Sequence, residues 1–136
     1  MRLNEHQAEL FKAKNFAVVA TVGDDGAPQT TIVWVDEEDG RPVFNTTNWR
    51  AKGHNLRRDP RVSVLVWAHD DPHRYIEVEG VAELEDDVGG QHMHGMSRKY
   101  TGKDFHTPVD RLIVAEVDRD GVAGTHGTTR APARAG

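Results

Sequence analysis

The stretch Phe16-Ala-Val-Val-Ala-Thr-Val22, followed by Gly23-Asp-Asp-Gly26 and then by Gln29-Thr-Thr-Ile-Val-Trp-Val35, decides how this chain is expected to fold. Both apolar runs are rich in β-branched residues, which favour strands because their side chains pack well on a pleated surface. The segment between them combines glycine with aspartate, a composition typical of a tight hairpin turn. We therefore predict two antiparallel strands joined by a hairpin.

Strand-like runs separated by turns continue along the rest of the chain and predict a mainly β, α+β fold. Turn signals follow at 36–40 and 70–72, where acidic residues stand beside glycine or proline. Regular strand spacing with hairpin turns favours an antiparallel barrel or sandwich of roughly six or seven strands over a doubly wound parallel sheet. Further strands are expected at 41–47, 62–68, 75–82, 112–117 and around 122–126, and short helices at 4–14 (N-cap Asn4), 50–57 and 86–100.

Composition limits the classes of protein to which the chain can belong. The 136 residues suit one domain, which we place at 1–126, and the Thr-, Ala-, Arg- and Gly-rich segment 127–136 is expected to be a disordered tail. The 17 Lys and Arg against 22 Asp and Glu argue against nucleic acid as a partner. Zero cysteines exclude disulfides, thiolate metal sites and thiol nucleophiles. With no apolar run of roughly 20 residues and no signal peptide, we expect a cytoplasmic protein without a membrane partner.

A cationic segment, Arg50-Ala-Lys-Gly-His-Asn-Leu56, follows directly on the predicted strand that ends at Thr47. Free backbone N–H groups and the helix dipole favour an anion at such a helix start. Arg50 can add a bidentate fork and Lys52 a point charge. Two basic residues alone are more often solvated residues of a surface helix, but the ordered elements around them favour a phosphorylated ligand.

This order of elements resembles the split β-barrel flavin-binding superfamily of pyridoxamine 5′-phosphate oxidase-like proteins, and within it the small oxidoreductases that use the deazaflavin coenzyme F420. The specific part of the resemblance is Arg50-x-Lys52-x-x-Asn55-Leu56 followed by Asp59-Pro60-Arg61. The resemblance implies an antiparallel split β-barrel of the FMN-binding type with short flanking helices. Supporting segments occur in the same order from about Glu5 to His126, at 18–22, 25–29, 32–35, 44–47 and 75–80.

The resemblance also implies which residues would hold the cofactor phosphate. In the family this phosphate is held by the Arg and Lys of the helix start, which are Arg50 and Lys52 here. Thr46 or Thr47 would donate a hydroxyl from the preceding strand. Asn55 shares a helix face with Lys52 and is a further candidate, although a capping role or a bond to backbone would explain it as well.

For the tricyclic ring, the resemblance implies contacts from the second predicted strand, at Ile32, Val33 and Trp34. The family builds two such sites between the subunits of a homodimer, so Trp67, His73 and Tyr75 would reach the ligand from the partner chain. The alternative for the tryptophans is a place in the core or in the dimer interface, which is common for aromatic residues in strands.

The activity implied is hydride transfer between reduced F420 and a small unsaturated acceptor. Such chemistry resides in the cofactor, in keeping with a sequence that offers no nucleophile–base pair and no identifiable catalytic residue. Two alternatives stay open: an FMN-binding oxidoreductase of the same superfamily, and a non-catalytic F420 carrier or binding protein. The segment 128–136 lacks the basic and aromatic pattern of relatives that oxidise pyridoxamine phosphate, which argues against vitamin B6 chemistry.

His92-x-His94 is the one pattern that suggests a metal. Residues two apart do not share a helix face, and a third ligand is not evident in the sequence. We therefore predict two surface histidines and no metal site.

Overall fold

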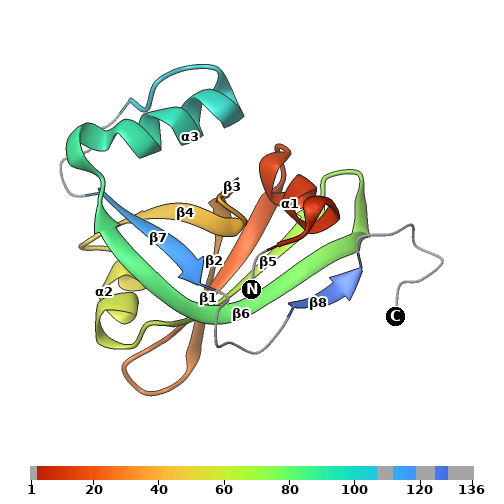
Figure 1. Cartoon of the computed structure of the whole chain (residues 1–136). Coiled ribbons are helices and arrows are strands. Elements are labelled where there is room, and N and C mark those ends of the chain that lie inside the picture. The colour runs from red at the N-terminus through yellow and green to blue at the C-terminus, as the bar shows by residue number, and fades with distance from the viewer. Residues whose placement is uncertain (1–2, 107–111, 119–124, 129–136) are drawn as a thin grey trace.

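The computed structural model describes residues 3–106, 112–118 and 125–128 (Figure 1). None of the helices in these ranges is long and apolar enough to cross a membrane. The elements in chain order are α1 (Glu5–Lys12), β1 (Phe16–Val22), β2 (Pro28–Trp34), β3 (Asp36–Glu38), β4 (Arg41–Thr47), α2 (Ala51–Arg58), β5 (Arg61–Ala68), β6 (Asp71–Asp86), the 3-10 turn η1 (Val88–Gly90), α3 (Gln91–Thr101), β7 (Leu112–Asp118) and β8 (Thr125–Thr128).

The described strands form one antiparallel sheet in the order β2-β1-β5-β6-β7-β4-β3, with β8 paired to β6. Its two ends, β2 and β3, are joined through Val35, so the sheet curves back on itself (Figure 1). It does not close, because β2 is paired with β1 alone and β3 with β4 alone. This is a split barrel with flanking helices, as predicted.

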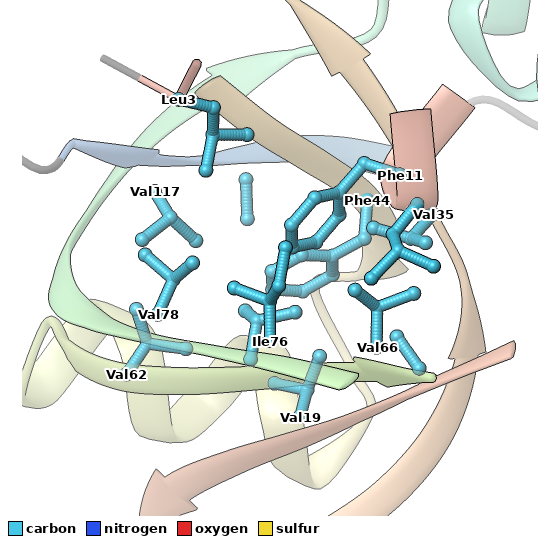
Figure 2. Packing of buried hydrophobic residues seen from close by; sticks show 14 of the residues in the cluster. Leu3, Phe11, Val19, Val35, Phe44, Val62, Val66, Ile76, Val78 and Val117 are labelled. Carbon is cyan, nitrogen blue, oxygen red and sulfur yellow. The ribbon is translucent and has the colours of Figure 1, made fainter. Parts of the chain in front are cut away.

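The core fills the inside of this curved sheet. Along β1 and β5 every second residue is buried, the alternation that a strand with one buried face requires. Phe11 from α1 and Phe44 from β4 meet there at 0% exposure (Figure 2). Leu56 from α2 belongs to the same cluster. The core therefore draws α1 and α2 onto the sheet from different parts of the chain.

Several elements differ in extent from the sequence prediction. The segment 36–40, expected to be only a turn, begins with the short strand β3, which pairs with β4. The strand expected at 75–82 is the 16-residue β6, because its acidic second half pairs with β7 and tertiary pairing outweighs weak strand propensity. The strand expected around 122–126 is β8, so residues 127 and 128 belong to a strand rather than to a tail. The rest of the predicted tail, 129–136, lies outside the described residues.

The helix α3 is attached to the sheet at its C-terminal end. The Lys99 ammonium donates to the Phe11 carbonyl at 2.9 Å and to the Val35 carbonyl at 2.6 Å. The Tyr100 hydroxyl accepts from the Val35 N–H at 3.1 Å and bonds to the Asn15 carbonyl. These bonds also satisfy the backbone of Val35, the residue that links β2 to β3.

Gly53 brings α2 against the end of β4. A Cβ added there would clash with the Thr47 carbonyl oxygen, well inside van der Waals contact. Because that oxygen belongs to the backbone, neither partner can yield cheaply. Glycine therefore sets how close α2 lies to the strand that precedes it.

Gly53→Ala should consequently displace α2 and lower the free energy of unfolding by about 1–3 kcal/mol, the usual cost of overpacking. Chemical denaturation monitored by tryptophan fluorescence measures this. Gly95→Ala in α3 is the matched control, since a Cβ there meets no atom within 4 Å. It should raise stability slightly through helix propensity, by up to about 1 kcal/mol. Equal effects of the two substitutions would contradict the close approach.

Candidate functional site

The candidate site begins at the N-terminus of α2. Arg50 is the N-cap residue, with extended backbone, and its side chain makes no capping bond. The first-turn N–H groups of α2 thus receive no capping bond from the side chain of their N-cap residue. The Arg50 guanidinium is exposed and lies 5.3 Å from the centre of the Trp49 ring, in a cation–π arrangement. This helix start offers donors and positive charge to an anion.

Lys52 is a buried cation without a carboxylate partner in the described part of the chain. Only 7% of the residue is exposed, and its ammonium donates to the Thr31 hydroxyl at 3.0 Å. Burial lowers the pKa of Lys52, and the nearby Arg50 guanidinium lowers it further. An ammonium carries three donors, so hydrogen-bonding capacity remains for a ligand. A buried ammonium costs free energy unless it is paired, so an anion would stabilise this arrangement.

Two threonine hydroxyls at the end of β4 are the predicted donors to this part of the site. The hydroxyls of Thr46 and Thr47 are buried and have no hydrogen-bond partner among the described residues. Successive strand residues point to opposite faces. Thr46 shares its face with the core residue Phe44 and so points to the side on which α2 packs. Thr47 points to the other side, so the two hydroxyls do not both face Lys52.

Asn55 shares the helix face of Lys52, as expected, and its side chain is bonded within the protein. Its amide donates to the Thr21 hydroxyl at 3.0 Å and to the Gln29 carbonyl at 3.0 Å, and its own oxygen accepts from Arg58 at 3.3 Å. Every polar atom of the side chain is therefore engaged inside the protein. The structure puts Asn55 beside the site without giving it a free group for a ligand.

The predicted ring contacts on β2 divide between the two faces of the strand. Val33 packs against the core cluster, on the same face as Thr31. Ile32 and Trp34 point the other way; Ile32 is 67% exposed, and Trp34 stacks on Tyr100 with ring centres 5.1 Å apart. A cofactor ring lying along β2 could contact Ile32, Val33 and Trp34 together only if it extended around the edge of the strand.

Trp67 and Tyr75 lie on the outer face of the sheet. They are cross-strand neighbours on β5 and β6, next to Phe16 and Trp34, which are paired on β1 and β2. Within one chain the sheet lies between them and the Lys52 side. Hence Arg50 and Lys52 lie close together, with Thr46 on the face of β4 toward which α2 packs, while Trp67 and Tyr75 form part of a separate aromatic row.

Sequence reasoning missed the partners that hold the basic residues in place. Thr31 and Gln29 appeared only as residues of a strand, although both face α2. Gln29 and Thr31 are two residues apart and therefore share one face of the strand, which was a weak signal that this face meets polar groups.

The two histidines expected on the surface are in fact partly buried and bonded. The His92 ring contacts the Glu38 carboxylate at 2.6 Å and the Asn45 amide oxygen at 3.0 Å. His94 accepts a hydrogen bond from the Phe105 N–H at 3.0 Å. Both side chains thus help to hold α3 and the loop after it.

Comparison with known proteins agrees with this architecture. A model of the pyridoxamine 5′-phosphate oxidase family matches residues 3–117. Among solved structures, an F420 reductase is similar at a TM-score of 0.79 and 26% identity, covering 91% of this chain and 98% of the other. A conserved hypothetical protein from Mycobacterium tuberculosis gives 0.73 and 26%, covering 94% and 86%.

General Stress Protein 26 from Bacillus anthracis str. Sterne has a TM-score of 0.66 at 23% identity, covering 85% of this chain and 88% of the other; this likeness concerns the fold alone. The match to the family model extends over β1 to β7 and includes the whole cationic segment around α2. The chain therefore belongs to the pyridoxamine 5′-phosphate oxidase family of split-barrel, flavin-type oxidoreductases.

Proposed function

We propose that this protein is an F420-dependent oxidoreductase that transfers a hydride between reduced F420 and a small unsaturated acceptor. The observation that carries the proposal is the Lys52 ammonium, buried without a carboxylate partner in the described part of the chain, at a helix start whose N–H groups have no side-chain cap. The unpartnered hydroxyl of Thr46 adds a donor on the same side of the sheet. A phosphate group supplies the negative charge and the acceptor oxygens that this set of donors lacks.

The residues of the chain would bind and orient the cofactor. Lys52 and the first turn of α2 would hold the phosphodiester, and Thr46 would donate to one of its oxygens. Arg50 would neutralise the remaining charge from the solvent side. F420, when bound, would supply the hydride chemistry. The protein's share of the rate would be positioning, which can contribute about 7–11 kcal/mol when reacting atoms are held at contact.

The likeness to an F420 reductase and the distribution of cations favour F420 over FMN. Arg57 on the outer side of α2 donates to the Asn48 side chain and has no carboxylate partner in the described chain. Together with Arg50, Arg57 places positive charge outside the inner Lys52 position, which suits a cofactor with more than one anionic group. FMN remains the second candidate, supported by the match to the oxidase family.

A visible spectrum and a turnover assay test the assignment together. We expect the protein to quench the fluorescence of added F420 and to accelerate oxidation of reduced F420 by at least one acceptor from a panel of enones and quinones. Riboflavin-type absorption bands in the purified protein would favour FMN instead. Tight F420 binding without acceleration by any acceptor would identify a carrier, and binding of neither cofactor would refute the proposal.

The titration of F420 into two variants tests the phosphate anchor. Lys52→Ala and Arg50→Ala should each weaken binding by about 1.5–3 kcal/mol, because each removes a charge-assisted bond. Lys14→Ala is the matched control: it removes an exposed cation outside the site and should leave the affinity unchanged. Unchanged affinities for both site variants would exclude the anchor.

The same titrations at increasing pH test how much the positive charge of Lys52 contributes to the affinity for F420. Burial and Arg50 lower the pKa of Lys52 in the free protein, and a bound anion would favour the charged form and raise that pKa again. Affinity should therefore be constant below the free-protein pKa of Lys52. It should fall as the pH rises from that value toward the pKa in the complex. Lys52→Ala should abolish this fall.

We also propose that the protein is a homodimer whose partner copy contributes Trp67 and Tyr75 to each site. The outer face of the sheet supports this, because it exposes Phe16 at 45%, Ile32 at 67% and Val81 at 45%. The same face holds a hollow of about 420 Å³, where Ala20 and Ser63 provide small side chains. An exposed apolar face with both projecting and recessed positions suits a self-complementary contact.

Ile32→Glu should therefore shift the protein to monomer and weaken F420 binding in parallel, as measured by sedimentation velocity and fluorescence titration. Val88→Glu is the control, since Val88 is 82% exposed on η1, away from this face. A monomeric wild type would refute the dimer. A dimer that Ile32→Glu leaves intact would place the interface elsewhere. The cytoplasmic location stays a prediction, which cell fractionation tests.

A further inference from the structure

Three polar side chains of α2 lie at intervals of three residues and bond the same hairpin. We name Lys52, Asn55 and Arg58 the polar stripe of α2. Residues three apart on a helix share a face, and this face is turned toward the β1–β2 hairpin. Lys52 bonds Thr31 near the middle of β2, and Arg58 bonds the Val22 carbonyl and the Asp24 carboxylate at the hairpin turn.

Asn55 is the central link of this stripe. Its two amide hydrogens go to different strands, Thr21 on β1 and Gln29 on β2, each at 3.0 Å. Its oxygen accepts from Arg58, so it also connects to the third member of the stripe. The residue is 7% exposed, and Thr21 is 3% exposed. Hydrogen bonds at such burial are costly to lose, because each unpaired group would then lack water as well.

The attachment matters most for β2, which lies at one end of the sheet and has a backbone ladder with β1 only. A strand held on one edge alone can twist away from the barrel unless side chains restrain it. The bonds from Asn55 and Lys52 to Gln29 and Thr31 are such a restraint. They set the separation between the strand and the start of α2.

We propose that Asn55 is a positioning residue: it fixes the distance between Lys52, the proposed phosphate anchor, and the strand β2, which would contact the cofactor ring under the proposed function. This rests on the proposed function, because it concerns one ligand that contacts both places. When one ligand contacts two places on a protein, a fixed distance between these places lets both contacts form in their best geometry. Loss of the spacing should reduce the phosphate contribution even though Lys52 itself is retained.

The test compares F420 with its phosphate-free deazaflavin chromophore, each titrated by fluorescence into wild type and Asn55→Leu. The ratio of the two affinities reports how much the phosphate end contributes. We expect Asn55→Leu to lower this ratio roughly tenfold or more, while the affinity for the chromophore alone stays within about threefold of wild type. A wild-type ratio in Asn55→Leu would overturn the positioning role.

Gln29→Leu provides a second route if Asn55→Leu fails to fold, since it removes only the β2 acceptor of Asn55. Gln29→Leu should also lower the ratio of the two affinities, and an unchanged ratio would overturn the inference. Ile76→Val controls for stability: it trims a core residue of β6 and should keep the wild-type ratio. A ratio near one in wild type itself would refute the phosphate anchor, and with it the proposed function, rather than the role of Asn55.

Discussion

The contact between Gly53 and the backbone of Thr47 is the constraint on which the candidate site depends. It lets α2 lie directly against the end of β4, so that Lys52 is buried while Arg50 stays in solvent. The same placement directs Asn55 and Arg58 at the β1–β2 hairpin. With a helix held further out, Lys52 would be an ordinary solvated cation, and it would lose the low-dielectric setting that strengthens its attraction for an anion.

Burial of Lys52 is unfavourable by itself, and ionisable groups with perturbed pKa values cluster at functional sites, which supports an anion site here. The chain bears a net charge of −5, yet of the four cations on α2 and its N-cap only Arg58 has a carboxylate partner among the described residues. This local excess against the overall sign would draw a negatively charged cofactor to one place on the surface. The division between an inner cation and outer ones is the feature that distinguishes F420 from FMN in our proposal.

Much of the fold could be read from the sequence, because β-branched runs and glycine-containing turns report local structure. Strands β1 and β4 have the predicted limits, and the Asn4 cap of α1 is present as a capping box. The second half of β6 could not be predicted, since Glu83 and Glu85 favour a strand only when β7 lies alongside. For the candidate site, the roles of Arg50, Lys52 and Thr46 stay predictions, and the hydrogen bonds of Asn55 were not predicted. These bonds depend on where Gln29 and Thr21 come to lie after folding, which local patterns do not encode.

The strand order has a consequence for how the molecule assembles. β7, which comes late in the chain, lies between β6 and β4, where it pairs with residues as distant in sequence as Val43. Contacts of such long range are slow to form, because the chain loses much freedom before they are made. During synthesis, the edges of β4 and of the second half of β6 that pair with β7 therefore stay unpaired until residues 112–118 have been made. That interval exposes unpaired strands to neighbouring chains, so the yield of folded protein should depend on how quickly β7 fills its gap.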